Sequence, residues 1–396
     1  MTLTVKMRKP EVYKNASSLK KGAFFFAIMR CDKIIKIIED WAPKSIAWEK
    51  DNVGLQVGSL RREVKNILIC LDVDEKVVDE ASRKKCNLII SHHPLLFRSL
   101  KKLDVGKDKI SRIIEKLIKK DITLYSAHTN LDFTKDGVSF QLANRLKLIN
   151  QIFLVNLSSN QNKISVFVPG SHADKVAEAM HSAGAGIIGE YANCSFRTLG
   201  TGTFRGSKKS NPRIEIKGNL ERVEEVKIEV LVNSFDVSKV IAAMKQAHPY
   251  EEVAFDVYPL ANENVNYGMG VIGELKNELS QNEFLNLVTK SLKTKNLRFT
   301  NGSKSKIKKV AVCGGSGSDL LDTAIQNNAD AFVTADVKYH TFQDAESKIL
   351  LVDAGHFETE IPVLDEIKNR LEKSLIDKTK VYKFSGSTNP IVFYNN

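Results

Sequence analysis

The sequence predicts an α/β protein in which two α/β lobes are interrupted by an inserted α+β domain. Apolar runs typical of strands alternate with amphipathic helical patterns near both ends of the chain, whereas the middle has a different order of elements. The length of 396 residues and a hydrophobic content of 42% are enough for two or three ordinary cores. Together these observations favour layered α/β units around a separate small domain.

The elements of the two lobes follow one rule, with short apolar runs as buried strands and amphipathic stretches between them as helices. In the first lobe we expect strands at 67–73, 87–91 and 122–126, with helices at 75–84 and 109–120. In the second lobe we expect strands from Val310 and at 331–334 and 349–353, with helices at 320–327 and 361–371.

The middle of the chain, residues 164–258, predicts a complete small domain. Its pattern is strand, helix, strand, strand, helix, strand, which is the ferredoxin-like order. Because the α/β pattern resumes afterwards, we expect an insertion at a loop, with linkers at 150–163 and 260–270. The resulting segments are a leader at 1–30, the first lobe at 31–150, the insert at 151–262 and the second lobe at 263–396.

The net charge of +12 suggests a polyanionic partner, but its distribution weakens that interpretation. Residues 1–30 hold seven basic residues against one acidic residue, so half of the excess lies in this leader. The leader resembles an organelle transit peptide in composition, or it precedes a true start at Met29, where a helical pattern begins. The second interpretation is favoured, and nucleic-acid binding is not expected.

The remaining composition indicates a cytoplasmic protein with no membrane span. The longest apolar runs, such as 23–29, are far shorter than the roughly 20 residues that a span needs. Five widely spaced cysteines with no C-x-x-C pair predict neither a disulfide framework nor a zinc ribbon.

Histidines are concentrated where the expected strands end. His92 and His93 follow the run 87–91, His128 and Asp132 follow 122–126, and His356 follows 349–353. Glu360 lies four residues after His356, on the same face if a helix has begun there. Open α/β sheets bind their ligands at the carboxyl ends of strands, so we expect these side chains to meet at one edge.

Imidazole and carboxylate together are ligands for Zn, Mn, Fe and similar divalent ions. Two such ions can hold a water between them and stabilise the charge that develops in a hydrolytic transition state. A single histidine is more often a structural residue, but the grouping of these side chains favours a metal site.

Five strings carry a resemblance to a known family: DNVGLQVG, SHHPLLF, SAHTNLD, TADVKYHTFQDA and DAGHFETE. They resemble the signature blocks of the GTP cyclohydrolase 1 type 2 homolog family, also called Ngg-interacting-factor-3-like dinuclear metal centre proteins. The insert resembles the PII/CutA-like domain of the longer bacterial members, through segments that include AHPYEEVAFDVYPL. The resemblance extends from about Cys31 to Asn396.

The resemblance implies two divalent metal ions per chain. His93 and Asp132 would bind one ion, His92 and His356 the other, and Glu360 would bridge both. His128 and His340 match motif positions near the site and are candidates for proton transfer. The family also implies a toroidal homohexamer, a small-molecule substrate with a nucleotide as the candidate, and hydrolysis through a metal-bridging hydroxide.

Three questions stay open at the level of sequence. The loop with Gly314, Gly315 and Gly317 could hold a phosphate through its backbone N–H groups, or could be a tight connection. The HPYEE segment at 248–252 could bind a ligand or simply end a helix. The protein could be a metal-dependent hydrolase, or a non-catalytic metal-binding regulator whose insert senses a small molecule.

Overall fold

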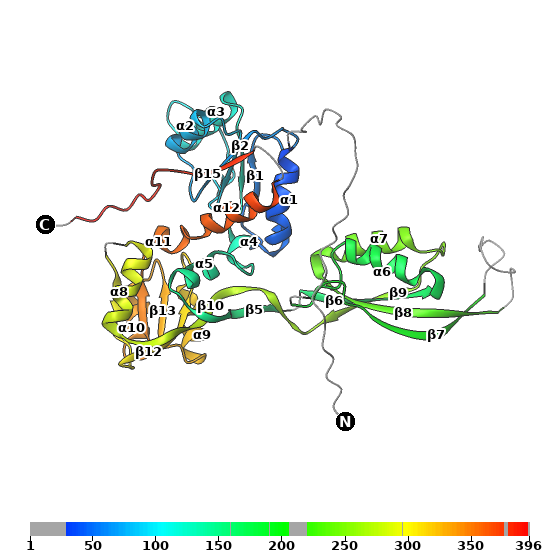
Figure 1. Cartoon of the computed structure of the whole chain (residues 1–396). Coiled ribbons are helices and arrows are strands. Elements are labelled where there is room, and N and C mark those ends of the chain that lie inside the picture. The colour runs from blue at the N-terminus through cyan, green and yellow to red at the C-terminus, as the bar shows by residue number, and fades with distance from the viewer. Residues whose placement is uncertain are drawn as a thin grey trace, which may run out of the picture.

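The computed structural model describes residues 29–158, 160–189, 191–205, 220–294, 296–375 and 379–394. The leader at 1–30 lies outside these residues except for Met29 and Arg30. Within the described residues the chain has a mixed α/β fold built on three sheets (Figure 1). No helix in this part of the chain combines the length and apolar character that crossing a membrane requires.

The first sheet has five strands in the order β1-β4-β3-β2-β15. Its strands are β1 (Gly54–Val57), β2 (Asn66–Cys70), β3 (Leu88–Ser91), β4 (Thr123–Ser126) and β15 (Lys380–Lys383). All neighbours are parallel except β1 and β4. Helices α1 (Cys31–Trp41) and α12 (Val363–Ser374) contribute to one hydrophobic cluster of this lobe, and α2 (Glu75–Arg83) and α3 (Lys109–Lys119) to another. Burial by helices explains why β3 and β4 are apolar runs rather than alternating patterns.

The second sheet has six strands in the order β11-β14-β13-β12-β10-β5. They are β5 (Ile149–Ser158), β10 (Glu263–Ser280), β11 (Arg298–Thr300), β12 (Lys306–Val312), β13 (Ala331–Thr334) and β14 (Leu350–Asp353). Helices α5 (Val138–Arg145) and α8 (Gln281–Leu292) share one core cluster with it, and α9 (Leu321–Gln326) and α10 (Tyr339–Ala345) share another. Helix α5 and the short helices α4 (Thr129–Asp132) and α11 (His356–Glu360) lie between the two sheets (Figure 1).

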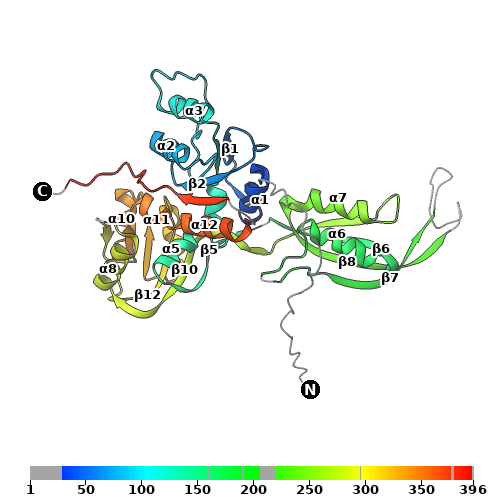
Figure 2. The same cartoon turned by 45° about the horizontal axis from the view of Figure 1, so that its top comes forward.

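The third sheet belongs to the inserted segment and has the antiparallel order β7-β8-β6-β9. Its elements in chain order are β6 (Gln161–Pro169), α6 (Ala173–Ser182), β7 (Phe196–Phe204), β8 (Glu221–Asn233), α7 (Val237–Ala247) and β9 (Phe255–Leu260). Both helices share one hydrophobic cluster with β6 and β8. The unit stands to one side of the two lobes in both views (Figure 2).

The expectation of linkers at 150–163 and 260–270 is wrong. Strands β5 and β10 pair antiparallel along these segments, from Glu263 opposite Ser158 to Glu274 opposite Ile149. The connection to the insert is therefore a two-stranded ribbon that continues into the second sheet. Strand pairing satisfies the backbone groups that a linker would leave to water.

Candidate metal centre

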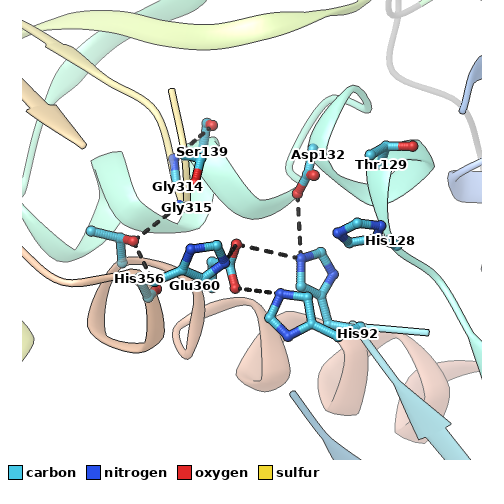
Figure 3. A network of polar contacts seen from close by, with 12 residues as sticks. His92, His128, Thr129, Asp132, Ser139, Gly314, Gly315, His356 and Glu360 are labelled. Atoms are coloured by element: carbon cyan, nitrogen blue, oxygen red, sulfur yellow. Dashed lines mark hydrogen bonds and ion pairs between the residues drawn. The ribbon is translucent and has the colours of Figure 1, made fainter. Parts of the chain in front are cut away.

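Six side chains from both lobes converge between the two sheets, and Figure 3 labels all of them except His93. His92 and His93 follow β3, His128 follows β4, and Asp132 ends helix α4. The other two, His356 and Glu360, are the first and last residues of α11, which follows β14. The structure thus brings together the five predicted metal ligands, with His128 beside them.

His92 is fully buried at the centre of this group. Its Nδ1 donates to the Ala127 carbonyl oxygen at 2.9 Å, which turns Nε2 toward the carboxylates. Nε2 lies 3.5 Å from Asp132 Oδ1 and 3.8 Å from Glu360 Oε1. The bond to Ala127 fixes the tautomer in which Nε2 carries a lone pair, the form that binds a metal.

Glu360 lies between His93 and His356. The Nε2 of His93 is 3.1 Å from Oε2, and the Nε2 of His356 is 3.0 Å from Oε1. His356 and Glu360 face the same way because one turn of α11 separates them. One carboxylate therefore presents each of its oxygens to a different imidazole.

Three aspartates that the sequence did not single out hold the outer nitrogens of the histidines. Nδ1 of His93 donates to Asp72 at 2.9 Å, and Nδ1 of His356 donates to Asp336 at 2.6 Å. Nδ1 of His128 donates to both oxygens of Asp51 at 3.0 Å. Such carboxylate partners orient metal-binding histidines and raise their basicity. Their position in the sequence could have identified two of these aspartates, because Asp72 and Asp336 come just after strands β2 and β13, as His92 comes just after β3.

The donor set fits divalent metal ions. Three buried atoms of the centre have no hydrogen-bond partner among the residues that the structure describes: Nε2 of His92, Oδ1 of Asp132 and Oε2 of Glu360. Each lies close to another of the three or to His93. Buried polar atoms are normally hydrogen-bonded, so three orphans in one place indicate a missing partner. Two sets of three donors lie within 4.8 Å of one another, namely His92, His93 and His128, and His93, His356 and Glu360.

Among the five predicted ligands, His92 is closest to Asp132, whereas His93 and His356 are both closest to Glu360. This arrangement differs from the pairing that the family resemblance implies. The division of the five ligands between two ions stays a prediction.

The charges of the centre are strongly coupled. Burial disfavours a proton on His93, but the interactions of its ring with Asp72 and Glu360 outweigh burial and raise the pKa of His93 to about 10. The same balance, with Glu360 and Asp336 as partners, raises the pKa of His356 to about 9. Burial and the neighbouring Glu360 charge raise the pKa of Asp132, while the surrounding histidines outweigh burial and hold the pKa of Glu360 well below its usual range.

The glycine loop after β12 packs against the centre. Its N–H groups donate to protein hydroxyls, from Gly314 to Ser139, from Gly315 to Thr359 and from Gly317 to Thr334. Those three groups are therefore already used, which favours the tight connection over a phosphate loop. Gly315 has φ +63°, and a Cβ there would lie 2.3 Å from Glu360 Oε1.

Two other predicted positions have hydrogen-bond partners of their own. His340 is exposed on α10, where its Nδ1 is 2.9 Å from Gln343 Oε1, and neither set of candidate metal donors found in the described residues includes it. In the HPYEE segment, His248 accepts from Tyr250 N at Nδ1 and donates from Nε2 to the Phe167 carbonyl oxygen at 2.9 Å. Both ring nitrogens of His248 are thus used, Nδ1 within the turn after α7 and Nε2 against strand β6.

Comparisons with known proteins find the same family over most of the chain. Residues 29–390 match the model of the Duf34/NIF3 (NGG1p interacting factor 3) family. A GTP cyclohydrolase 1 type 2 homolog of Halalkalibacterium halodurans is 42% identical over 365 residues, covering 91% of this chain and 98% of that protein. The Bacillus subtilis protein of the same name is 38% identical over 366 residues, with the same coverage.

Solved structures show the same relationship. A Bacillus cereus protein related to NIF3 has a TM-score of 0.81 at 40% identity, covering 93% of this chain and 100% of that one. A Staphylococcus aureus protein has a TM-score of 0.73 at 31% identity, covering 92% of this chain and 99% of that one. With its fold, its histidine-rich centre and its relatives in agreement, the chain belongs to the Duf34/NIF3 family.

Proposed function

We propose that the protein is a metal-dependent hydrolase acting on a nucleotide or related phosphorylated small molecule. The observation that carries the proposal is the set of three orphaned, buried donor atoms on His92, Asp132 and Glu360. His93 and His356 would complete a centre for two divalent ions. The name of the relatives, GTP cyclohydrolase 1 type 2 homolog, supports the choice of a nucleotide.

Divalent ions at this centre would supply Lewis acidity and an activated water. The protein's own side chains would orient the metal ligands and transfer protons. Asp72 and Asp336 hold His93 and His356 in place. His128 reaches the centre with its Nδ1–H committed to Asp51, which leaves Nε2 able to take a proton and favours it over His340 as the proton-transfer residue.

Metal-loaded protein should be incubated with a panel of nucleotides and phosphoesters, and each reaction scored by the mass of its products. The proposal expects turnover of at least one compound and its loss in Glu360→Gln. A panel without turnover from a protein that does hold its metals would contradict hydrolysis.

A second candidate function is regulation by the inserted unit, which we propose to be PII/CutA-like. The specific observation is a hollow of about 570 Å³ beside α6, lined by Asp174, Ala177, Glu178, His181, Ser182, Asn193, Ser195 and Arg197. In this alternative the metals are structural and a small molecule binds the insert. Ligand-dependent protection of α6 from hydrogen exchange, without turnover, would favour it.

We also propose, from the family resemblance, that the protein assembles as a homohexamer in the cytoplasm. The five cysteines Cys31, Cys70, Cys86, Cys194 and Cys313 are all free thiols, in keeping with a reducing compartment. Native mass spectrometry of the metal-loaded protein tests the assembly, because a monomer at micromolar concentration would contradict it.

A further inference from the structure

The segment after β15 runs from the first lobe toward α11. Strand β15 extends the first sheet beside β2, and Phe384 N continues the pairing by donating to the Ile69 carbonyl oxygen. Ser385 is then fixed to the buried Glu80 of α2, through its N–H at 3.0 Å and its hydroxyl at 2.6 Å. Within 385–394, Thr388 and Asn389 are half-buried and the other residues are exposed.

Thr388 continues a chain of contacts into the metal centre. Its hydroxyl donates to Asp72 Oδ2 at 2.9 Å, while the other oxygen of Asp72 accepts from His93 Nδ1 at 2.9 Å. The Nε2 of His93 in turn faces Glu360 at 3.1 Å. A threonine outside the core thereby occupies the oxygen of Asp72 that His93 does not use.

Asn389 makes the matching contact on α11. Its Nδ2 donates at 3.0 Å to Oε1 of Glu358, which lies on α11 between His356 and Glu360. Its Oδ1 accepts from Ile391 N at 3.0 Å, so the side chain is held from both ends. Two consecutive residues therefore bind the carboxylate that orients His93 and a carboxylate on the helix that carries His356 and Glu360.

We infer that residues 385–390 form a C-terminal strap in which Thr388 and Asn389 are positioning residues for the metal centre. The inference rests on the proposed metal centre. Thr388 fixes the rotamer of Asp72 and hence the direction of His93, and Asn389 fixes α11 relative to the first lobe. Metal ligands that are already oriented lose less freedom on binding, so the strap raises metal affinity.

The test measures Co²⁺ affinity by chelator competition, together with the visible absorption spectrum of the Co²⁺ protein. Thr388→Val removes the hydroxyl but keeps the shape, and Thr388→Ser restores the hydroxyl. We expect Thr388→Val to bind about tenfold more weakly with an altered spectrum, at the lower end of the range for outer-shell partners, and Thr388→Ser to recover both. Thermal unfolding of the metal-free variants checks that the fold is retained.

Truncations provide a matched control. A chain that ends at Val392 keeps both positioning residues and the Ile391 N–H that holds Asn389, so it should bind like the full chain. A chain that ends at Ser387 should lose at least as much affinity as Thr388→Val. Unchanged affinity and spectrum in both Thr388→Val and the Ser387 truncation would overturn the strap while leaving the metal centre intact. A full-length protein that binds no Co²⁺ would overturn the proposed function and the strap with it.

Discussion

Nε2 of His92 and Oδ1 of Asp132 face each other at 3.5 Å, and neither buried atom has a hydrogen-bond partner in the described part of the chain. Leaving such groups unpaired in a core costs about 1–3 kcal/mol each. Unpaired buried polar atoms are therefore expected at sites that bind a ligand such as a metal ion. His92 follows β3 and Asp132 ends the helix after β4, so the order of strands in the first sheet places the two unpaired atoms together.

Metal binding should release protons. The pKa values of about 10 for His93 and about 9 for His356 lie above the ordinary value of 6.5, so both rings are charged in the metal-free protein at pH 7.5. Metal affinity should therefore rise by up to about 100-fold per pH unit between pH 7 and 8.5, corresponding to two protons. Calorimetry in buffers of different ionisation enthalpy counts these protons, and an enthalpy independent of the buffer would contradict the assignment.

The same pKa values predict the opposite trend for the stability of the metal-free protein. A histidine whose pKa is raised on folding stabilises the fold fully below pH 6.5, and that contribution disappears as the pH rises through 9 to 10. Chemical denaturation of the metal-free protein between pH 6 and 10 should show this decline. His93→Gln should flatten the pH dependence, and an equal slope in the variant would be inconsistent with this origin.

Gly315→Ala should weaken metal binding. The new Cβ would lie 2.3 Å from Glu360 Oε1, and the φ of +63° adds backbone strain of about 1 kcal/mol. Gly189→Ala is the control, because Gly189 has φ +58° but its added Cβ would meet no atom within 4 Å among the described residues beyond its chain neighbours. Both variants should lose thermal stability, but only Gly315→Ala should lose metal affinity. Equal affinities would show that Glu360 can move away without loss.

Asp51→Asn tests the role of His128. The carboxylate of Asp51 accepts from His128 Nδ1 and also from the N–H and hydroxyl of Thr129. If His128 transfers a proton, the variant should lose turnover by about 100-fold while metal content stays the same. His340→Ala should retain activity, since the contacts found for His340 lie on its own helix. Loss of metal from Asp51→Asn would instead make His128 a ligand.

Gly268→Ala tests the ribbon that connects the insert. A Cβ at Gly268 would lie 2.3 Å from the Val155 carbonyl oxygen and 2.5 Å from the Phe153 ring. Overpacking of this kind costs about 1–3 kcal/mol, so the melting temperature should fall. Gly200→Ala, where the added Cβ meets open space, should leave it nearly unchanged. A stable Gly268→Ala protein would mean that β5 and β10 separate easily.

Much of the fold was readable from sequence because its signals are local. The runs that end at Ser91 and Ser126 are buried on both faces and gave the strands β3 and β4. The strand pairing of the two expected linkers could not be predicted, because the partner of β5 lies more than 100 residues later in the sequence. For the same reason, nothing local indicated that β15, in the expected second lobe, would join β2 of the first sheet.

The metal ligands could be predicted from the sequence where they are of a rare residue type. Histidines are few, so their positions after strands stood out, and α11 places His356 and Glu360 on one face as the spacing suggested. Asp51, Asp72 and Asp336 were not recognised as partners, because carboxylates are common on surfaces and only the fold shows which ones reach an imidazole. Thr388 was missed because its role depends on the path of the chain after β15.

The metal content of the purified full-length protein tests the central claim most directly. After equilibration with a divalent metal and desalting, elemental analysis should find about two ions per chain. His92→Ala combined with Glu360→Ala should reduce this to less than one. Less than one ion per chain in the unaltered protein, together with no change in the double variant, would contradict the dinuclear centre.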